Sequence, residues 1–482
     1  MKRVLTFTLL TLTLSAAPKV IKVAPESLSG HVSFLASDAL EGRRSPSTGL
    51  DTASEYIASW FRRLGLEAPV AGSYFQVAKT PLRVSNAGAF HLTIESGSTR
   101  INIPASAVSG ALNNGASLRN QPLFKVQLDN AASLEGIKSE DVNGRIVLLV
   151  PKAGLRLQSV FGSLSVKLAE WKSAAVLVVD PASNAEGFGV PRLGIRAVSG
   201  IVRLHSQEVA GLAATLPFGL TNATVSLDAA KAEEQTAELR NVAGILRGTN
   251  PKLNDSYIMV SAHYDHIGRL ASGKGDLIFN GANDDASGVA MMLEMAAVLK
   301  GRRPKRSILF VAFYGEESGL VGSRYFGKNA FLDLNKIVAQ VNLEQMGRTD
   351  VDGANQLAAF NLTGFDFTDL HLTLIAAAKP YHVRLFKKEA MSDPFFSRSD
   401  NQALADVGVP STTASLGYEF PDYHGLGDSW EKLDYKNMAQ LTAAMSAGIR
   451  QLANNKMEPR WIEANPAVKK YVDAWKARQP KK

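Results

Sequence analysis

The pattern of apolar and polar residues divides this chain into three regions, and the first of them begins with a helix. Between Asp51 and Leu64, residues Ala53, Ile57 and Phe61 recur at helical spacing, and Gly65 follows. This spacing predicts an amphipathic helix that ends at Gly65. We assign residues 24–85 to the N-terminal part of the main domain.

The middle of the chain, residues 86–235, has short apolar runs separated by turn residues. Examples are the runs 146–150 and 174–179, the second of which is followed by Asp180-Pro181. Such runs are typical of strands. No cluster of acid–base side chains lies in this region, so we interpret it as an inserted β-rich domain.

From residue 236 onward, strand-length apolar runs alternate with a helix-length one. The runs 257–262, 307–313 and 337–341 have the length of buried strands, and 286–300 has the length of a helix. This order predicts an α/β fold with a mixed, largely parallel sheet flanked by helices, here over residues 236–456.

The two ends of the chain have their own patterns. Lys2 and Arg3 precede an apolar run over 4–14 and small residues at 15–17, which predicts a signal peptide over 1–17 and export to the periplasm or the medium. No other run is long enough to span a membrane. Basic residues are densest in 457–482, for which we predict a solvated tail.

Composition narrows the chemistry. The chain has 482 residues, 45% of them hydrophobic, which predicts a globular protein of more than one domain. The formal charge of +8 is spread along the chain without a nucleic-acid-binding motif, so we expect no nucleic acid partner. The sequence contains no cysteine, so a metal would be bound by His, Asp and Glu.

Candidate metal ligands follow the predicted strands of the third region. In open α/β sheets, sites gather at the carboxyl ends of strands. The candidates are His263 and Asp265 after strand 257–262, Asp284 in the turn before helix 286–300, Glu316 and Glu317 after strand 307–313, and Glu344 after strand 337–341.

These positions predict a two-metal centre. The adjacent carboxylates Glu316 and Glu317 repel each other unless a proton or a cation relieves them. A dizinc centre with N and O ligands would use His263, Glu317, Glu344 and a second histidine, with a carboxylate between the metals. Glu316 would then stay off the metal to move protons. By contrast, we interpret Asp285 as a helix cap and His266 as structural.

Four sequence blocks together resemble the M28 zinc peptidases. They are His263–Gly268, Gly281–Gly288, Gly315–Ser323 and Asp422–His424, and they follow one another in the family's order. The segments 33–38 and 41–44 are also similar to members of this family. The middle region is similar to the protease-associated (PA) domain that is often inserted in such enzymes.

The resemblance implies a zinc exopeptidase fold and a role for each matching residue. His263 and Glu317 would be terminal ligands on different zinc ions, Asp284 would bridge the two Zn2+, and Glu344 and His424 would complete the ligand set.

The resemblance also implies three catalytic roles. Glu316 would be the general base that deprotonates the metal-bound water, Asp265 would orient His263, and Tyr423 would donate a hydrogen bond to the tetrahedral intermediate. The implied function is aminopeptidase action on peptides with a free N-terminus.

Two positions depart from the family pattern. Glu344 stands where Asp is usual, which bears on substrate preference more than on metal binding. Asn401 follows Ser399-Asp400 where His or Gln is commoner, which we interpret as variation in the substrate pocket.

Several alternatives remain open at this point. A carboxypeptidase would need a cationic pocket, which Arg324, Arg348 or Arg398 could supply. A glutaminyl cyclase would use one zinc, and a non-catalytic receptor-like module would bind without turnover. The absence of His-Glu-x-x-His, Gly-x-Ser-x-Gly and P-loop motifs argues against other enzyme classes. The sequence does not indicate an oligomeric state.

Overall fold

The computed structural model of this protein describes residues 20–479, except 113, 156–159, 182–184, 194–199, 272–274, 350–356, 390 and 418–419. The predicted signal peptide lies outside the described residues, so it and the export that it implies stay predictions. Within the described ranges, no helix has both the length and the apolar character needed to cross a membrane.

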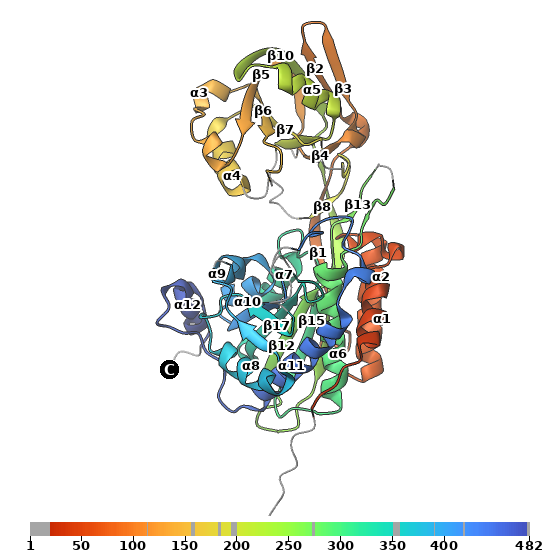
Figure 1. Cartoon of the computed structure of the whole chain (residues 1–482), viewed down its shortest axis with the longest axis vertical. Coiled ribbons are helices and arrows are strands. Elements are labelled where there is room, and N and C mark those ends of the chain that lie inside the picture. The colour runs from red at the N-terminus through yellow and green to blue at the C-terminus, as the bar shows by residue number, and fades with distance from the viewer. Residues whose placement is uncertain are drawn as a thin grey trace, which may run out of the picture.

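The described strands form two large sheets, which lie in separate lobes of an elongated molecule (Figure 1). The sheet of the larger lobe has the strand order β18-β17-β19-β16-β12-β15-β11-β1-β8. Its strands are β1 (Phe75–Val84), β8 (Arg192–Leu193), β11 (Glu233–Leu246), β12 (Tyr257–His263), β15 (Ser307–Phe313), β16 (Ile337–Glu344), β17 (Ala359–Leu362), β18 (Arg384–Phe386) and β19 (Ser411–Ser415).

The centre of this sheet is parallel and its flanks contain antiparallel pairs. Strands β19, β16, β12 and β15 run in one direction. Strand β11 pairs antiparallel with β15, β1 with β11, and β17 with β19. The predicted mixed α/β sheet is confirmed, with a larger antiparallel share than we expected.

Helices cover both faces of the larger sheet because its central strands are apolar on both sides. Alternate residues of β12 face opposite layers: Ile258 and Val260 pack in one core, and Tyr257 and Met259 in another. The first layer contains α1 (Pro25–Leu35), α2 (Thr48–Leu64), α6 (Ser287–Lys300), α8 (Leu370–Ala378) and α11 (Tyr435–Asn454), and the second contains α7 (Val321–Lys328) and α10 (Asn401–Asp406).

The helix predicted over residues 51–64 is confirmed as α2, with one more turn at its start. The Ser47 side chain accepts a hydrogen bond from the Leu50 N–H and caps the first turn. Gly65 ends the helix with φ 66°, a left-handed conformation that glycine adopts without strain.

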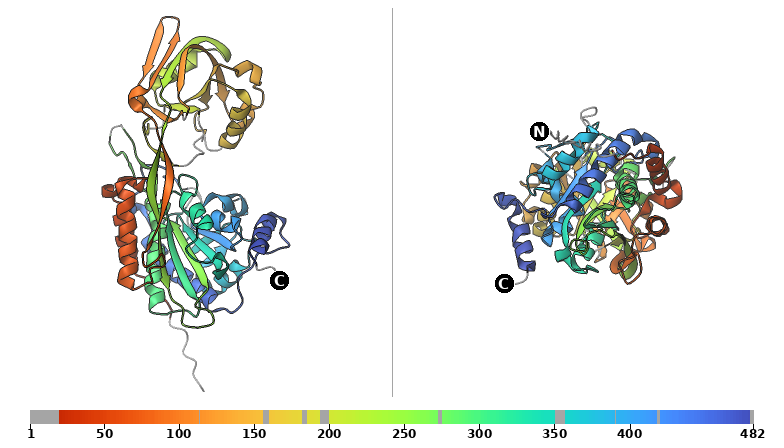
Figure 2. Two further views of the ribbon diagram at one scale, coloured as in Figure 1. Left: turned by 180° about the vertical axis from the view of Figure 1, so that it is seen from behind. Right: turned by 90° about the horizontal axis from the view of Figure 1, so that it is seen from below.

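The smaller lobe lies between β1 and β11, two long paired strands that lead into it (Figure 2). Its sheet has the order β3-β2-β10-β5-β6-β7-β9-β4. The strands are β2 (His91–Ser96), β3 (Thr99–Ile103), β4 (Val108–Ala111), β5 (Ala116–Leu128), β6 (Ile146–Pro151), β7 (Ala175–Val179), β9 (Ile201–Leu204) and β10 (Gly219–Ala229).

This lobe is less purely β than the sequence indicated. Strands β5, β6, β7 and β9 are parallel neighbours, and the helices α3 (Ser139–Val142), α4 (Phe161–Trp171) and α5 (Gln207–Thr215) connect strands of this sheet. Strand β8 also differs, because it falls within the predicted insertion but pairs with β1 in the larger sheet. The likeness to a PA domain stays a prediction.

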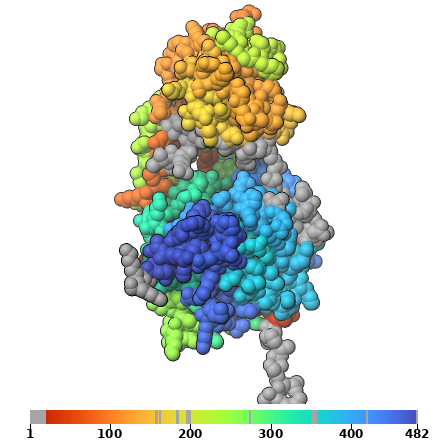
Figure 3. All heavy atoms as spheres, turned by 90° about the vertical axis from the view of Figure 1, so that its left-hand side faces the viewer, coloured from red at the N-terminus to blue at the C-terminus, as the bar shows by residue number. Residues whose placement is uncertain are grey.

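The expectation of a solvated C-terminal tail is wrong. Residues 469–478 form the helix α12 (Lys469–Arg478), whose Tyr471 and Val472 are buried with Trp461 and Phe396. The rings of Trp461 and Tyr471 stack at 5.0 Å. Figure 3 shows this segment (dark blue) lying against the larger lobe. Its lysines occupy the outer face, which is why composition alone suggested a tail.

Candidate metal centre

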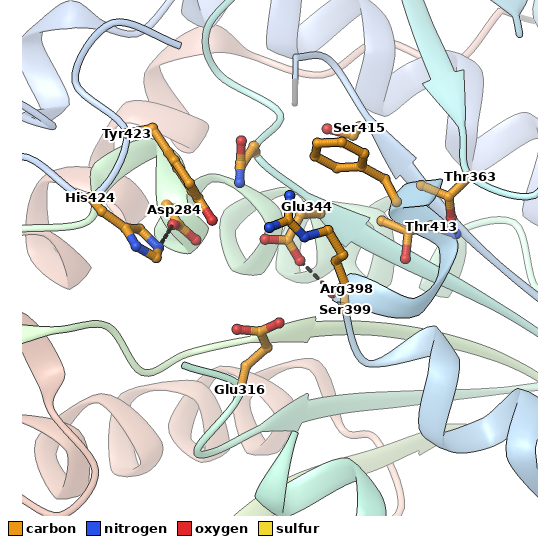
Figure 4. A pocket seen from close by; sticks show the side chains of 12 residues that line it. Asp284, Glu316, Glu344, Thr363, Arg398, Ser399, Thr413, Ser415, Tyr423 and His424 are labelled. Atoms are coloured by element: carbon orange, nitrogen blue, oxygen red, sulfur yellow. Dashed lines mark hydrogen bonds and ion pairs between the residues drawn. The ribbon is translucent and has the colours of Figure 1, made fainter. Parts of the chain in front are cut away.

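The predicted ligands meet at the carboxyl edge of the parallel strands. Because β12, β15 and β16 are parallel, His263 at the end of β12, Glu316 and Glu317 after β15, and Glu344 at the end of β16 lie at one edge. The turn before α6 adds Asp284 there, and the loop after β19 adds Tyr423 and His424. The structure therefore brings together the five predicted metal ligands with Glu316 and Tyr423. Figure 4 shows Asp284, Glu344 and His424 of this group beside Glu316 and Tyr423.

Asp284 lies between the two histidines of this group. Its Oδ1 is 3.2 Å from His263 Nε2, and its Oδ2 is 3.1 Å from His424 Nε2. The side chain is 2% exposed. One carboxylate thus faces an imidazole on each side, which is the arrangement that a residue shared between two cations requires.

The first side of the centre consists of His263 and Glu344. Their Nε2 and Oε1 atoms are 3.3 Å apart. Ser399 Oγ donates a hydrogen bond to the other Glu344 oxygen at 2.5 Å. Glu344, which is longer than the usual Asp, is therefore held in place by the hydroxyl of Ser399. Ser399 belongs to the segment 399–401, which we interpreted from the sequence as variation in the substrate pocket.

The second side of the centre consists of His424 and Glu317. The His424 Nε2 atom is 3.2 Å from Glu317 Oε2. His266, which the sequence suggested was structural, also contacts this side, since its Nδ1 is 2.9 Å from Glu317 Oε1. The Nε2 atom of His266 is buried and forms no hydrogen bond with the described residues.

Asp265 contacts both a predicted ligand and the loop of the predicted base. The His263 Nδ1 atom is 3.2 Å from the Asp265 backbone carbonyl and 3.6 Å from its Oδ1. The same Oδ1 accepts a hydrogen bond from the Glu316 N–H at 3.1 Å. Asp265 therefore links the orientation of His263 to the position of Glu316.

Glu316 and Tyr423 face the cavity beside these ligands. In Figure 4 the Glu316 carboxylate lies across the cavity from Glu344, and the Tyr423 hydroxyl is on the side of Asp284. The Tyr423 ring stacks on that of His424 with centroids 4.0 Å apart. No hydrogen bond of the Glu316 carboxylate is found among the described residues, so this group is available to a substrate or a water molecule.

The turn that carries Asp284 is fixed by groups that the sequence did not reveal. Asp428 accepts hydrogen bonds from the backbone N–H groups of Asn283 and Asp284 at 3.0–3.1 Å. Gly281 has φ 60°, and a Cβ atom there would lie 2.4 Å from the Asp284 carbonyl oxygen. Asp285 accepts from the Gly288 N–H at 3.0 Å, which confirms its predicted capping role.

Arg43 supports the same turn from the N-terminal segment. Its buried guanidinium donates to the carbonyls of Tyr264, Asn280 and Gly281 at 2.8–2.9 Å. It thereby connects the chain after His263 to the chain before Asp284. The resemblance of residues 41–44 to the family was a signal in the sequence that could have indicated the role of Arg43. No signal in the sequence indicated the role of Asp428.

Negative charge is in excess in this centre. Burial lowers the pKa of His424, but Glu317 and Asp284 outweigh that effect and raise it to about 11. Burial raises the pKa of Glu316 well above its usual value, and burial raises that of Asp400 to about 7. Such shifts arise where carboxylates crowd together out of water.

The donor set fits metal cations. Two groups of side chains each bring three donor atoms within 4.8 Å of one another: His263, Asp285 and Glu344, and His266, Asp284 and Glu317. Buried atoms without a hydrogen-bond partner among the described residues include His266 Nε2, Asp285 Oδ2 and both Asp400 oxygens. Imidazole and carboxylate donors suit zinc, and cations would offset the repulsion between the carboxylates.

A cavity of about 80 Å³ opens beside the centre. It is lined by Asp284, Glu316, Glu344, Gln345, Thr363, Phe395, Arg398, Ser399, Thr413, Ser415, Tyr423 and His424. Of the three arginines considered for a cationic pocket, Arg398 lines this cavity. Arg348 is paired with Asp422 at 2.6 Å, and Arg324 is not part of the lining.

Residues 241–449 match the model of a family described as Peptidase family M28. Aminopeptidase YwaD of Bacillus subtilis is 26% identical over 299 residues, which are 61% of this chain and 58% of that protein. A probable zinc metalloprotease of Pyricularia oryzae is 38% identical over 119 residues, 24% of this chain and 22% of that protein. The chain thus spans less than two thirds of these relatives.

Two solved structures have the same fold over most of this chain. An aminopeptidase from Aneurinibacillus sp. strain AM-1 has a TM-score of 0.59 at 21% identity and covers 91% of this chain and 96% of its own. BSAP, a zinc aminopeptidase from Bacillus subtilis, has a TM-score of 0.59 at 20% identity and covers 88% and 94%.

Proposed function

Residues 241–449 match the model of peptidase family M28, and we propose that the protein is an aminopeptidase that uses two zinc ions. The observation that carries the proposal is the position of Asp284. Its two oxygens face His263 and His424 at 3.2 and 3.1 Å. Each imidazole has a second carboxylate beside it, so two similar ligand sets share this residue.

Each zinc ion would have its own set of ligands. His263, Glu344 and one oxygen of Asp284 would bind the first, and His424, Glu317 and the other oxygen of Asp284 would bind the second. Bound zinc polarises a peptide carbonyl and lowers the pKa of water. A glutaminyl cyclase would need only one of these sets, and the presence of both favours the peptidase.

Glu316 is the proposed general base. It lines the cavity, and its carboxylate is free of hydrogen bonds among the described residues. It would accept a proton from the attacking water and pass it to the nitrogen of the leaving group. The Asp265 carboxylate would hold it in position through the Glu316 N–H.

Tyr423 is the proposed donor to the developing oxyanion. Its hydroxyl lies on the Asp284 side of the cavity, and its ring is held against His424. A hydrogen bond from this hydroxyl would grow stronger as charge builds on the carbonyl oxygen, which lowers the barrier.

The cavity favours cleavage at an N-terminus over cleavage within a chain. The carboxylates of Glu344 and Glu316 line it. These negative groups would attract a free α-ammonium group. A binding module without turnover has no need of Glu316 in this position.

Removal of the metal tests the proposal. We expect dialysis against 1,10-phenanthroline to abolish hydrolysis of leucine p-nitroanilide, because the carboxylates alone do not activate a carbonyl. Added zinc should restore the rate. The thermal midpoint should also fall in the stripped protein, since the buried carboxylates lose their counter-charge. Undiminished hydrolysis by protein shown to be free of metal would refute a metallopeptidase.

A further inference from the structure

Arg398 is a cationic side chain in the cavity wall with no anionic partner among the residues that the structure describes. It forms no ion pair and no hydrogen bond with the described residues, and its guanidinium carbon lies 4.7 Å from the centroid of the Phe395 ring. Figure 4 shows its side chain directed into the cavity beside Glu344. An unpaired guanidinium in such a place has its N–H donors available for a ligand.

The wall around Arg398 is polar, and three of its hydroxyl protons are already donated to neighbouring groups. Ser399 donates to Glu344, Thr413 to Asn401, and Ser415 to the carbonyl of Gly417. Among the described residues of the lining, Phe395 is the one large apolar side chain. A long aliphatic side chain would gain little from such a wall, whereas an anionic group would find a charged donor in Arg398.

We propose that Arg398 binds a carboxylate of the substrate and so determines its specificity. This inference rests on the proposed peptidase function. One source of the carboxylate is the side chain of an N-terminal Asp or Glu, which would enter this part of the cavity while the α-ammonium group meets Glu344. The other source is the free C-terminus of a dipeptide.

Electrostatics make the role of Arg398 decisive for anionic substrates. The remaining wall contains Asp284, Glu316 and Glu344, which repel a carboxylate. Without the guanidinium, the anionic substrate loses the charged donor of this part of the wall, while an uncharged isostere is hardly affected. Specificity then depends on one charge-assisted hydrogen-bonded pair, for which the planar guanidinium is well suited.

The test compares charged substrates with uncharged isosteres in zinc-loaded, full-length protein. The variants are Arg398→Met and Arg398→Lys, with Arg324→Met as the control because Arg324 is exposed on α7 outside the cavity lining. The substrate pairs are glutamyl and glutaminyl p-nitroanilide, and the dipeptide Ala-Ala and its C-terminal amide. Calorimetric binding of each pair to the Glu316→Gln protein repeats the comparison without turnover.

We expect the wild type to favour the carboxylate member of one pair and Arg398→Met to lose that preference. The kcat/KM ratio within the pair should fall roughly 10- to 100-fold, mainly through KM, which is the scale of a hydrogen bond to a charged group. Arg398→Lys should keep part of the preference and Arg324→Met all of it. If the preference is lost in the glutamyl pair, Arg398 binds the side-chain carboxylate of the N-terminal residue. If it is lost in the dipeptide pair, Arg398 binds the C-terminal carboxylate.

The outcomes separate this inference from the function on which it rests. Equal ratios in wild type and Arg398→Met, with efficient hydrolysis of leucine p-nitroanilide, would overturn the role of Arg398 and leave the aminopeptidase intact. No zinc-dependent hydrolysis of any free-amine substrate would overturn the function. In that case, the calorimetric data decide on the carboxylate site. If the ratio of affinities within each substrate pair is the same for wild-type and Arg398→Met protein, the carboxylate site is overturned as well.

Discussion

Glu316→Gln is expected to reduce kcat by about 10³-fold or more while both zinc ions stay bound. Glutamine has the same shape as glutamate but cannot take a proton from the attacking water. The change should leave the fold intact because the Glu316 carboxylate forms no hydrogen bond with the described residues. Steady-state hydrolysis of leucine p-nitroanilide and metal analysis of the same sample measure the two quantities.

A matched control separates this effect from a change of overall charge. Glu431 is an exposed glutamate outside the cavity lining, and Glu431→Gln should keep wild-type kcat. If Glu316→Gln retained more than a tenth of the wild-type rate, another group would be the base. If it lost zinc, Glu316 would be a ligand instead of a base.

Asp284→Asn is expected to remove both metals and with them the activity. The carboxylate lies 3.2 and 3.1 Å from the imidazoles of the two ligand sets, so a neutral amide weakens both at once. We expect the zinc content after dialysis to fall below one per chain and the rate to fall at least about 10³-fold. Elemental analysis of the dialysed protein gives the content directly.

The control for this variant is an aspartate of the same domain far from the centre. Asp255 forms an exposed ion pair with Lys336, and Asp255→Asn should keep its zinc and its activity. Circular dichroism should show that Asp284→Asn is folded. Full zinc content with normal affinity in Asp284→Asn would mean that this residue does not hold the two sites together.

The core of the fold was predictable because buried strands are continuous apolar runs. The runs 307–313 and 257–262 correspond to β15 and to β12, which extends one residue further, to His263. Strand β8 could not be predicted, since its two residues owe their conformation to pairing with β1. Helix α12 was missed because the few apolar residues that anchor it are scattered among lysines.

The ligands were predictable for a similar reason, whereas the groups that support them were not. His263, Asp284, Glu317 and Glu344 adjoin regular elements whose order fixes where they meet. Arg43 is 221 residues away from Tyr264 in the chain and donates a hydrogen bond to its carbonyl oxygen, so no pattern of side chains in the sequence indicates this contact. The hydrogen bond between Ser399 and Glu344 likewise depends on tertiary packing.

The central claim is that this protein is a zinc aminopeptidase, and the most direct measurement compares a leucyl peptide with its N-acetylated form in zinc-loaded protein. We predict that leucine is released from the free peptide at a rate at least roughly 100-fold above the rate for the acetylated one, because acetylation removes the charge that the carboxylates attract. Equal cleavage of both peptides, or cleavage of the acetylated peptide alone, would contradict the account.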